Sequence, residues 1–285
     1  MTYESLVYDE NQLVNFYNTF FSEALPFHTD FFCLAARKKY MTEEQKKAIN
    51  LGDTCMMNKT ILKEYNVKKF LSKVYQADAS ASFLTDRDGN YIPRSCVVFY
   101  MNINRTNVLK ATKEFKDLLN VWDYDIASCY MNSNPKENLG KQLKTIQNNL
   151  LKSFQGPKNA EGDWIDIDCD LGPVDEMTLL KYKNLIASRL QAQDVHVIQT
   201  HGGCHILISK KAISEYNRGV SERLTGQKTE VLKKLIMTSE KLLLYVRGLL
   251  KFDFSDEDVK EVKFNQNAAV PLPGTLQGGF PVKMI

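Results

Sequence analysis

The segment most informative about the architecture reads Asp163-Trp164-Ile165-Asp166-Ile167-Asp168-Cys169-Asp170. Its acidic and apolar residues alternate, and successive side chains of a β-strand face opposite sides. One face is therefore predicted to point into a core, with Ile165, Ile167 and Cys169. The opposite face is predicted to carry Trp164, Asp166, Asp168 and Asp170. The segment predicts a strand with one apolar and one acidic face.

Asp166 and Asp168 are the candidate catalytic and metal-binding residues. Along one face of a strand they are expected roughly 7 Å apart, which is twice the rise per residue. That spacing lets two carboxylates reach a pair of divalent ions held ~4 Å apart, as in phosphoryl displacement. Oxygen ligands favour Mg²⁺ or Mn²⁺ over zinc. The alternative is the solvated face of an edge strand, where charges oppose aggregation.

A second constellation is the glycine-containing segment Val195-His196-Val197-Ile198-Gln199-Thr200-His201-Gly202-Gly203-Cys204-His205-Ile206-Leu207-Ile208-Ser209. Gly202-Gly203 between two β-rich runs predicts a hairpin with a two-residue turn. In that register Thr200 lies opposite His205, beside the backbone amides of Gly203 and its neighbour. A hydroxyl, an imidazole and free amides would form a cradle for phosphate oxygens. The alternative is a hairpin whose polar face is incidental.

The remaining segments predict an α+β fold. The first third is expected to be mostly helical, with a helix around Leu13 to Phe20, a capping box opening at Thr42, and a helix over residues 61–74. A turn is expected at residues 86–90 and a strand at 96–103. Further helices are expected over residues 110–119, 139–154, 174–190 and 229–250, and a strand-rich segment over 259–285. We expect lobes at residues 1–158 and 159–285, the second with a mostly antiparallel sheet backed by helices.

Composition excludes several classes of protein. The net charge of +3 over 285 residues means that any nucleic-acid surface must be a local patch. None of the six cysteines form a C-x2-C pair, so a structural zinc site is not expected. Free thiols fit a reducing cytoplasm. The sequence has no apolar run of the roughly 20 residues that a membrane span needs, and no signal peptide is evident.

Basic residues supply two more candidates. Arg37 and Lys38, followed by Lys39 and Tyr40, could contact template phosphates, which dominate nucleic-acid affinity. They could equally form a solvated helix end. Lys283 could reach a triphosphate, or be a lysine at a strand edge.

The acidic strand and the hairpin together resemble the first two motifs of the archaeo-eukaryotic primase superfamily. The residues that carry this resemblance are Trp164-Ile165-Asp166-Ile167-Asp168 and Gly203-Cys204-His205. The form Gln-Thr-His-Gly-Gly-Cys-His is similar to phage and plasmid members. Val270-Pro271-Leu272-Pro273-Gly274-Thr275-Leu276-Gln277 resembles the Pro-Gly-Thr segment at the end of their catalytic domain. Arg37 to Tyr40 and Val98 to Asn104 resemble pieces of the family's N-terminal lobe.

The resemblance implies a two-lobed primase core with a recognition-motif-like sheet and a mostly helical N-terminal lobe. It implies that Asp166 and Asp168 hold Mg²⁺ or Mn²⁺ and that His205 contacts the incoming nucleotide. The implied activity is template-directed DNA synthesis from NTP or dNTP, with single-stranded template and primer as partners. A helicase or other replication protein would be a further partner.

The sequence departs from the family pattern in three places. Gly203 stands where serine is common, so a hydroxyl would have to come from Thr200. Asn265 stands where a third aspartate is expected; its oxygen can bind a metal but brings no charge, and Asp170 or Asp258 could replace the acid. Pro271 stands where a basic residue often precedes the Pro-Gly-Thr segment.

These departures keep open a primase-like nucleic-acid-binding subunit with weak or no catalysis. A rolling-circle type endonuclease ranks lower. That class needs His-hydrophobic-His, whereas His201 and His205 are predicted to lie on opposite faces of the hairpin.

Overall fold

The computed structural model describes residues 5–21, 25–62, 66–131, 146, 150, 153, 159–225, 233–265 and 269–285. The chain divides into two compact units. The core unit comprises Met1–Glu23, Phe31–Ile103 and Asp163–Ile285, and the second unit comprises Ala24–Asp30 and Asn104–Gly162. Both contain helix and antiparallel strands, so the fold is α+β, as predicted. The lobes at 1–158 and 159–285 stay a prediction.

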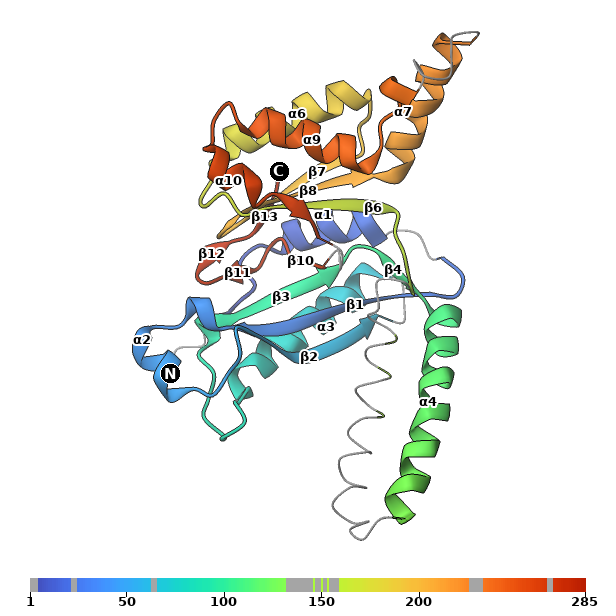
Figure 1. Cartoon of the computed structure of the whole chain (residues 1–285). Helices are drawn as coiled ribbons and strands as arrows, with labels where there is room; N and C mark the ends of the chain where they lie inside the picture. Colours follow the sequence, from blue (N-terminus) through green and yellow to red (C-terminus); the bar gives the residue numbers. More distant parts are fainter. Residues whose placement is uncertain are drawn as a thin grey trace. The chain divides into compact units, whose positions relative to one another are not determined.

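The order of elements along the chain is shown in Figure 1. The helices are α1 (Glu10–Phe21), α2 (Glu43–Ala48), α3 (Val67–Ser80), α4 (Val108–Met131), α6 (Glu176–Leu190), α7 (Lys210–Arg223), α9 (Ser239–Leu250) and α10 (Asp256–Lys260), with short 3-10 turns at Lys38–Tyr40, Ala81–Phe83 and Arg94–Cys96. The strands are β1 (His28–Arg37), β2 (Thr54–Leu62), β3 (Val97–Asn102), β4 (Arg105–Asn107), β5 (Ala160–Glu161), β6 (Trp164–Cys169), β7 (Val195–Thr200), β8 (Gly203–Ser209), β9 (Lys263–Phe264), β10 (Ala269–Pro271), β11 (Leu276–Gln277), β12 (Phe280–Pro281) and β13 (Lys283–Met284).

A five-stranded antiparallel sheet in the core unit carries the acidic strand, in the order β13-β7-β8-β6-β9. Helices α6 and α9 lie over one of its faces (Figure 1). The side chains of this sheet face and of α6 and α9 form a hydrophobic cluster. Ile165, Ile167 and Cys169 of β6 are buried in it, which confirms the predicted apolar face. The strand, the helix and the hairpin that follow residue 163 also match the prediction, whereas helix α7, directly after the hairpin, was not predicted.

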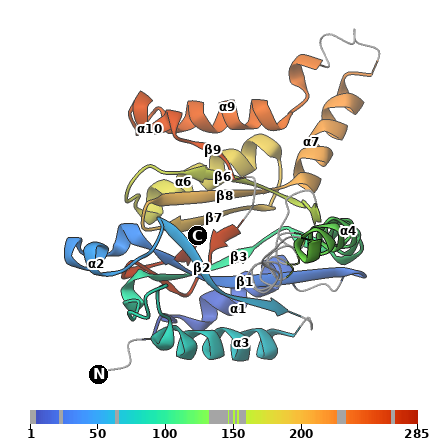
Figure 2. The same ribbon diagram turned by 60° about the horizontal axis from the view of Figure 1, so that its bottom comes forward.

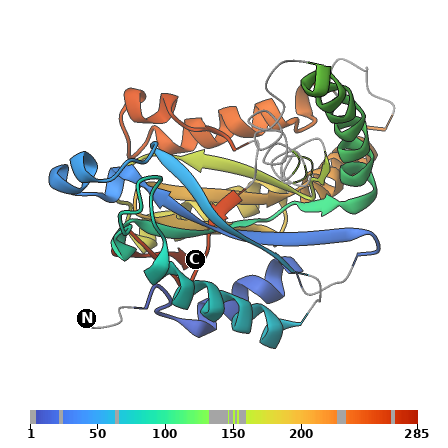
Figure 3. The same ribbon diagram turned by 90° about the horizontal axis from the view of Figure 1, so that it is seen from below.

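The opposite face of this sheet packs on a second hydrophobic cluster. Ile198 and Leu207 join residues of α1, α3, β1 and β3 there, and Phe20 of α1 packs edge-on against Trp164 at a ring-centroid distance of 4.8 Å. Helices α1 and α3 lie next to each other, as Figures 2 and 3 show. Within the core unit, β1 pairs with β3 and β2, and β3 pairs with β10. The sheet that bears Asp166 therefore has a packed layer on each face.

The prediction that the first third is mostly helical is wrong, because β1 and β2 occupy much of it. In β1 five consecutive residues, from Phe32 to Ala36, are buried. A strand buried on both faces lacks the period-two alternation that identifies half-buried strands. The helix predicted at residues 61–74 begins later, because Asn66 caps α3 by accepting hydrogen bonds from the backbone of Lys68 and Lys69. Helix α1, the capping box at Thr42 and strand β3 are confirmed.

The single helix predicted over residues 229–250 is also wrong. Helix α9 begins at Ser239, after Thr238, whose side chain accepts a hydrogen bond from the backbone of Lys241. The Lys241 ammonium donates to the carbonyls of Lys233, Lys234 and Ile236. These hydrogen bonds end the helical turn before α9, and the Thr238 cap begins α9 as a separate helix. Leu235, within the predicted helix, is 44% exposed. Most of the helix predicted at residues 139–154 lies outside the described residues.

The second unit contains α4 and the strands β4 and β5. The first residues of β1, His28 and Thr29, pair with β4, which also pairs with β5. Glu161 of β5 accepts hydrogen bonds from Asn107 and Lys110 and lies 2.7 Å from His28 Nε2. In the part of the chain that the structure describes, no helix is both long and apolar enough to cross a membrane.

Candidate functional site

Strand β6 lies inside its sheet and presents its two acids to the layer of β1 and β3. It pairs with β8 on one side and β9 on the other, so the edge-strand alternative is wrong. Asp168 is directly opposite His205, and Asp166 is opposite Leu207. Residues that pair directly across antiparallel strands share a face, so Asp166, Asp168 and His205 lie on one face of the sheet.

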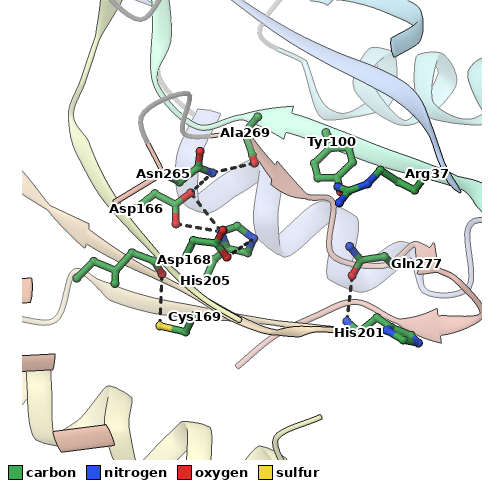
Figure 4. A network of polar contacts seen from close by, with 11 residues as sticks. Arg37, Tyr100, Asp166, Asp168, Cys169, His201, His205, Asn265, Ala269 and Gln277 are labelled. Carbon is green, nitrogen blue, oxygen red and sulfur yellow. Dashed lines mark hydrogen bonds and ion pairs between the residues drawn. The ribbon is translucent and has the colours of Figure 1, made fainter. Parts of the chain in front are cut away.

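The carboxylate of Asp166 is fully buried and held by two side chains (Figure 4). His205 Nδ1 lies 3.0 and 3.2 Å from its two oxygens, and Asn265 Nδ2 donates to Oδ2 over 2.7 Å. Burial alone would lower the pKa of His205, but Asp166 beside it raises that pKa to about 9. At neutral pH the imidazole is therefore a cation that donates to Asp166.

Asp168 is the more accessible acid of the pair. Its side chain is 26% exposed, and its Oδ1 lies 3.8 Å from His205 Nε2. Burial raises its pKa, and Asp170 and Asp166 raise it further, whereas His205 opposes them. Asp168 is thus a partly desolvated carboxylate whose charge a cation would stabilise.

Asp168 borders a cavity of about 230 Å³ that lies entirely within the core unit, whereas the buried Asp166 lies behind His205 and Asn265, which both line it. Its lining residues are Arg37, Lys39, Tyr100, Asp168, Asp170, Thr200, Gly202, His205, Asn265, Ala269, Pro271 and Gln277. One part of the lining is acidic, with Asp168 and Asp170, and another is basic, with Arg37 and Lys39. A cavity with both signs of charge suits a ligand that combines anionic groups with a cation.

The observed hairpin corrects the predicted register by two residues. The turn consists of His201 and Gly202, and Thr200 pairs with Gly203, not with His205. Gly203 has φ +141°, and a Cβ there would lie 2.0 Å from the carbonyl oxygen of Cys169. Close packing against the end of β6 therefore explains this glycine. A shift of two residues keeps every side chain on its predicted face, so Thr200 and His205 both line the cavity.

Four of the predicted residues lie elsewhere, the first being Gly203, which packs against the end of β6 and does not line the cavity. Lys283 of β13 pairs with Gln199, whose side chain reaches Val174 on the α6 face, and Lys283 forms an ion pair with Glu176. Lys38 does not line the cavity. Asp258 bonds with Ser255 in the first turn of α10, so Asp170 is the additional acid that reaches the site.

Two polar lining residues, Tyr100 and Gln277, were not predicted as site residues. Tyr100 of β3 accepts a hydrogen bond from Arg37 Nη1, and Gln277 of β11 accepts one from the backbone of His201 over 3.0 Å (Figure 4). Lys39 was considered only alongside Arg37 and Lys38. The feature of the sequence that could have predicted Lys39 is the Arg-Lys-Lys run directly after an apolar segment. If that segment is a strand, the basic residues lie at the end of the strand, where a site can form.

The donor atoms fit a divalent ion that a substrate helps to bind. In the described residues, no three His, Cys, Asp or Glu side chains are grouped to hold an ion. Magnesium at phosphoryl-transfer sites is bound by one or two carboxylates, with phosphates and water completing the shell. Asp168, with Asp166 and Asp170, could supply those carboxylates, whereas Asn265 directs its NH2 group at Asp166.

The lining side chains offer acids, cations and amides, and no cysteine or serine is among them. Transfer of a phosphoryl or nucleotidyl group needs no such nucleophile, because the attacking group belongs to the substrate. A comparison of the chain with models of protein families, with curated proteins and with solved structures finds no match.

Proposed function

We propose that the chain is a template-directed DNA primase-polymerase that transfers nucleotides from NTP or dNTP to a primer. The observation that carries the proposal is the meeting of Asp166, Asp168 and His205 on one sheet face, beside a cavity lined also by Arg37 and Lys39. The resemblance to the primase superfamily is carried by the same acidic strand and hairpin. The strand, helix, hairpin and helix order supports a recognition-motif-like sheet within a two-lobed core.

The residues divide into two roles. Asp166 and Asp168 would hold Mg²⁺ or Mn²⁺, which when bound neutralises phosphate charge and favours ionisation of the attacking hydroxyl. The His205 cation lies between both acids, and its Nε2 side faces Asp168 and the cavity, where it can donate to a phosphate oxygen. Thr200 adds a hydroxyl to the same cavity.

Asn265 favours a second candidate, a primase-like subunit that binds nucleic acid with weak or no catalysis. Its amide adds no negative charge beside Asp166. The endonuclease alternative is disfavoured, because His201 is exposed in the turn and contacts the rings of Tyr40 and Phe280, whereas His205 is buried against Asp166.

Primer synthesis and extension on single-stranded DNA, with Mg²⁺ or Mn²⁺, test the proposal. Asp168→Asn should reduce product by roughly a hundredfold or more, because a metal ligand stabilises transition-state charge by several kcal/mol. Asp163→Asn is the matched control, since this acid is exposed and precedes β6. Equal synthesis by Asp168→Asn would remove the assigned role. DNA binding without any synthesis by the wild type would favour the second candidate.

A further inference from the structure

Two cations, Arg37 and Lys39, line the cavity that Asp168 and His205 also line, whereas Lys38 between them does not. This separates three consecutive basic residues that the sequence could not tell apart. Arg37 ends β1, and Lys39 lies in the following 3-10 turn. Because the chain changes from a strand to a tight turn here, the side chains of Arg37 and Lys39 line the cavity and that of Lys38 does not.

Arg37 is held in place yet keeps a donor unused. Its Nη1 donates to the hydroxyl of Tyr100, and its guanidinium carbon lies 5.8 Å from the centre of that ring. Its Nε is buried and has no hydrogen-bond partner among the described residues. A buried, unsatisfied guanidinium nitrogen is costly, and a planar guanidinium matches the geometry of phosphate oxygens. Tyr100 is thus a positioning residue for Arg37.

Lys39 flanks the hairpin turn together with Asp170. A Cβ built on Gly202 would lie 3.8 Å from Lys39 Nζ and 3.4 Å from Asp170 Oδ1, so both charged groups lie beside a residue without a side chain. An ammonium at this position can reach a ligand over the turn without steric obstruction. Arg37 and Lys39 are therefore two cations in the lining of one cavity, and Lys39 is the one that lies near Asp170.

We propose that Arg37 and Lys39 bind the polyphosphate chain of the nucleotide and that the site recognises phosphates and not the base. This inference rests on the proposed function and replaces the template role predicted for Arg37. The cavity of about 230 Å³ is smaller than the roughly 300–1,000 Å³ of sites that enclose a drug-sized ligand. It can take phosphates and part of a sugar while the base stays outside, where a template strand can select it.

Charge gives the proposal a distinctive signature. Without a metal, the carboxylates of Asp168 and Asp170 repel a polyphosphate that Arg37 and Lys39 attract. Asp168→Asn should therefore strengthen metal-free binding of inorganic triphosphate by several fold, although the same substitution is expected to reduce primer extension. If Arg37 and Lys39 only supported the fold, Asp168→Asn would not strengthen triphosphate binding while it weakens primer extension.

The test is calorimetric titration of the full chain with inorganic triphosphate and with a non-hydrolysable dNTP, in EDTA and in Mg²⁺. Lys39→Met and Arg37→Met should each weaken binding of both ligands by roughly tenfold to a hundredfold, since each removes a charged hydrogen-bond donor. Lys38→Met is the control and should bind as the wild type does. Lys39 is exposed, so its variant should fold even if Arg37→Met does not, and Arg37→Lys keeps the charge there.

The outcomes separate this inference from the proposed function. Primer extension by the wild type, with unchanged nucleotide binding by Lys39→Met and Arg37→Lys/Lys39→Met, would overturn the inference and leave the function standing. Triphosphate binding that depends on Lys39, in a chain that neither makes nor extends primers, would support the inference and overturn the function. Loss of binding in Lys38→Met with retention in Lys39→Met would return the role to the predicted residue.

Discussion

Asn265 Nδ2 donates a hydrogen bond to Asp166 Oδ2 over 2.7 Å, and Asn265 N donates to the Asp166 carbonyl over 3.0 Å. The pairing of β9 with β6 produces this contact, because Phe264 lies opposite Ile167. The site therefore contains a neutral donor directly beside its most buried carboxylate. Without a metal, the amide of Asn265 satisfies the hydrogen-bonding capacity of the Asp166 carboxylate. If a metal were bound, an acid at position 265 would supply a negative charge that the amide lacks.

Asn265→Asp should exchange stability for metal affinity. Without metal, two carboxylates would face each other and a charged hydrogen bond would be lost, which costs roughly 2–3 kcal/mol. A divalent ion would relieve the repulsion, so Mg²⁺ or Mn²⁺ should raise the Tm of the variant more than that of the wild type. Thermal denaturation in EDTA and in metal measures both effects. Asn18→Asp, at an exposed position of α1, adds the same charge as a control; an equal metal response in both variants would contradict the prediction.

Asp168→Asn should stabilise the metal-free protein. The raised pKa of Asp168 means that folding disfavours its ionised form at neutral pH. Replacing it with a neutral amide removes that penalty, so the Tm in EDTA should rise by on the order of 2–4 °C. The stabilisation that the wild type gains from Mg²⁺ should disappear in the variant. A lower Tm of Asp168→Asn in EDTA would contradict the prediction, because it would show that the ionised carboxylate stabilises the folded state.

The strand that carries the acids could be predicted from sequence, because its information is local. Alternation from Trp164 to Cys169 defines both the bounds of β6 and its faces. The hairpin register was predicted two residues out, yet the face of His205 was right, since the pleat repeats every two residues. For the site residues of β6, β7 and β8, the sequence therefore predicted which face of the sheet each side chain occupies.

The rest of the site depends on contacts between distant segments. Strand β1 shows no alternation because both of its faces are buried, so nothing local indicated that Arg37 ends a strand at the cavity. Lys283 lies in the edge strand β13 and pairs with Glu176, as its alternative prediction of a strand-edge lysine requires; the two residues of β13 are too few for a sequence pattern to predict which face of the sheet its side chain joins. Asn265 was reached only through resemblance, and its contact with Asp166 comes from the pairing of β9.

Gly203→Ala should destabilise the hairpin far more than Gly202→Ala, although both add one methyl group to neighbouring glycines. At Gly203 the methyl would meet the Cys169 carbonyl oxygen at 2.0 Å in a backbone conformation of φ +141°. The cost should be roughly 3 kcal/mol or more. At Gly202 the nearest atoms are flexible side-chain ends 3.4 Å or farther away, so the cost should stay within about 1 kcal/mol. Urea denaturation compares the two, and equal losses would place the close approach elsewhere.

The ion pair of His205 with Asp166 should make stability fall as the solution becomes alkaline. The folded-state pKa of about 9 lies above the ordinary value of 6.5, so the contribution is fully present below pH 6.5 and is lost as pH rises through 9. A shift of that size corresponds to on the order of 3 kcal/mol. His205→Gln can still donate to Asp166 but cannot titrate, so its free energy of unfolding should change less between pH 7 and pH 9.5. His201→Gln, in the exposed turn, should keep the wild-type dependence, because the ring packs on Tyr40 and Phe280 and forms no ion pair with an acid among the described residues. Urea denaturation in EDTA at the two pH values gives all three slopes. If His205→Gln loses as much stability as the wild type, the loss originates in other groups and the imidazole of His205 is not a cation at neutral pH.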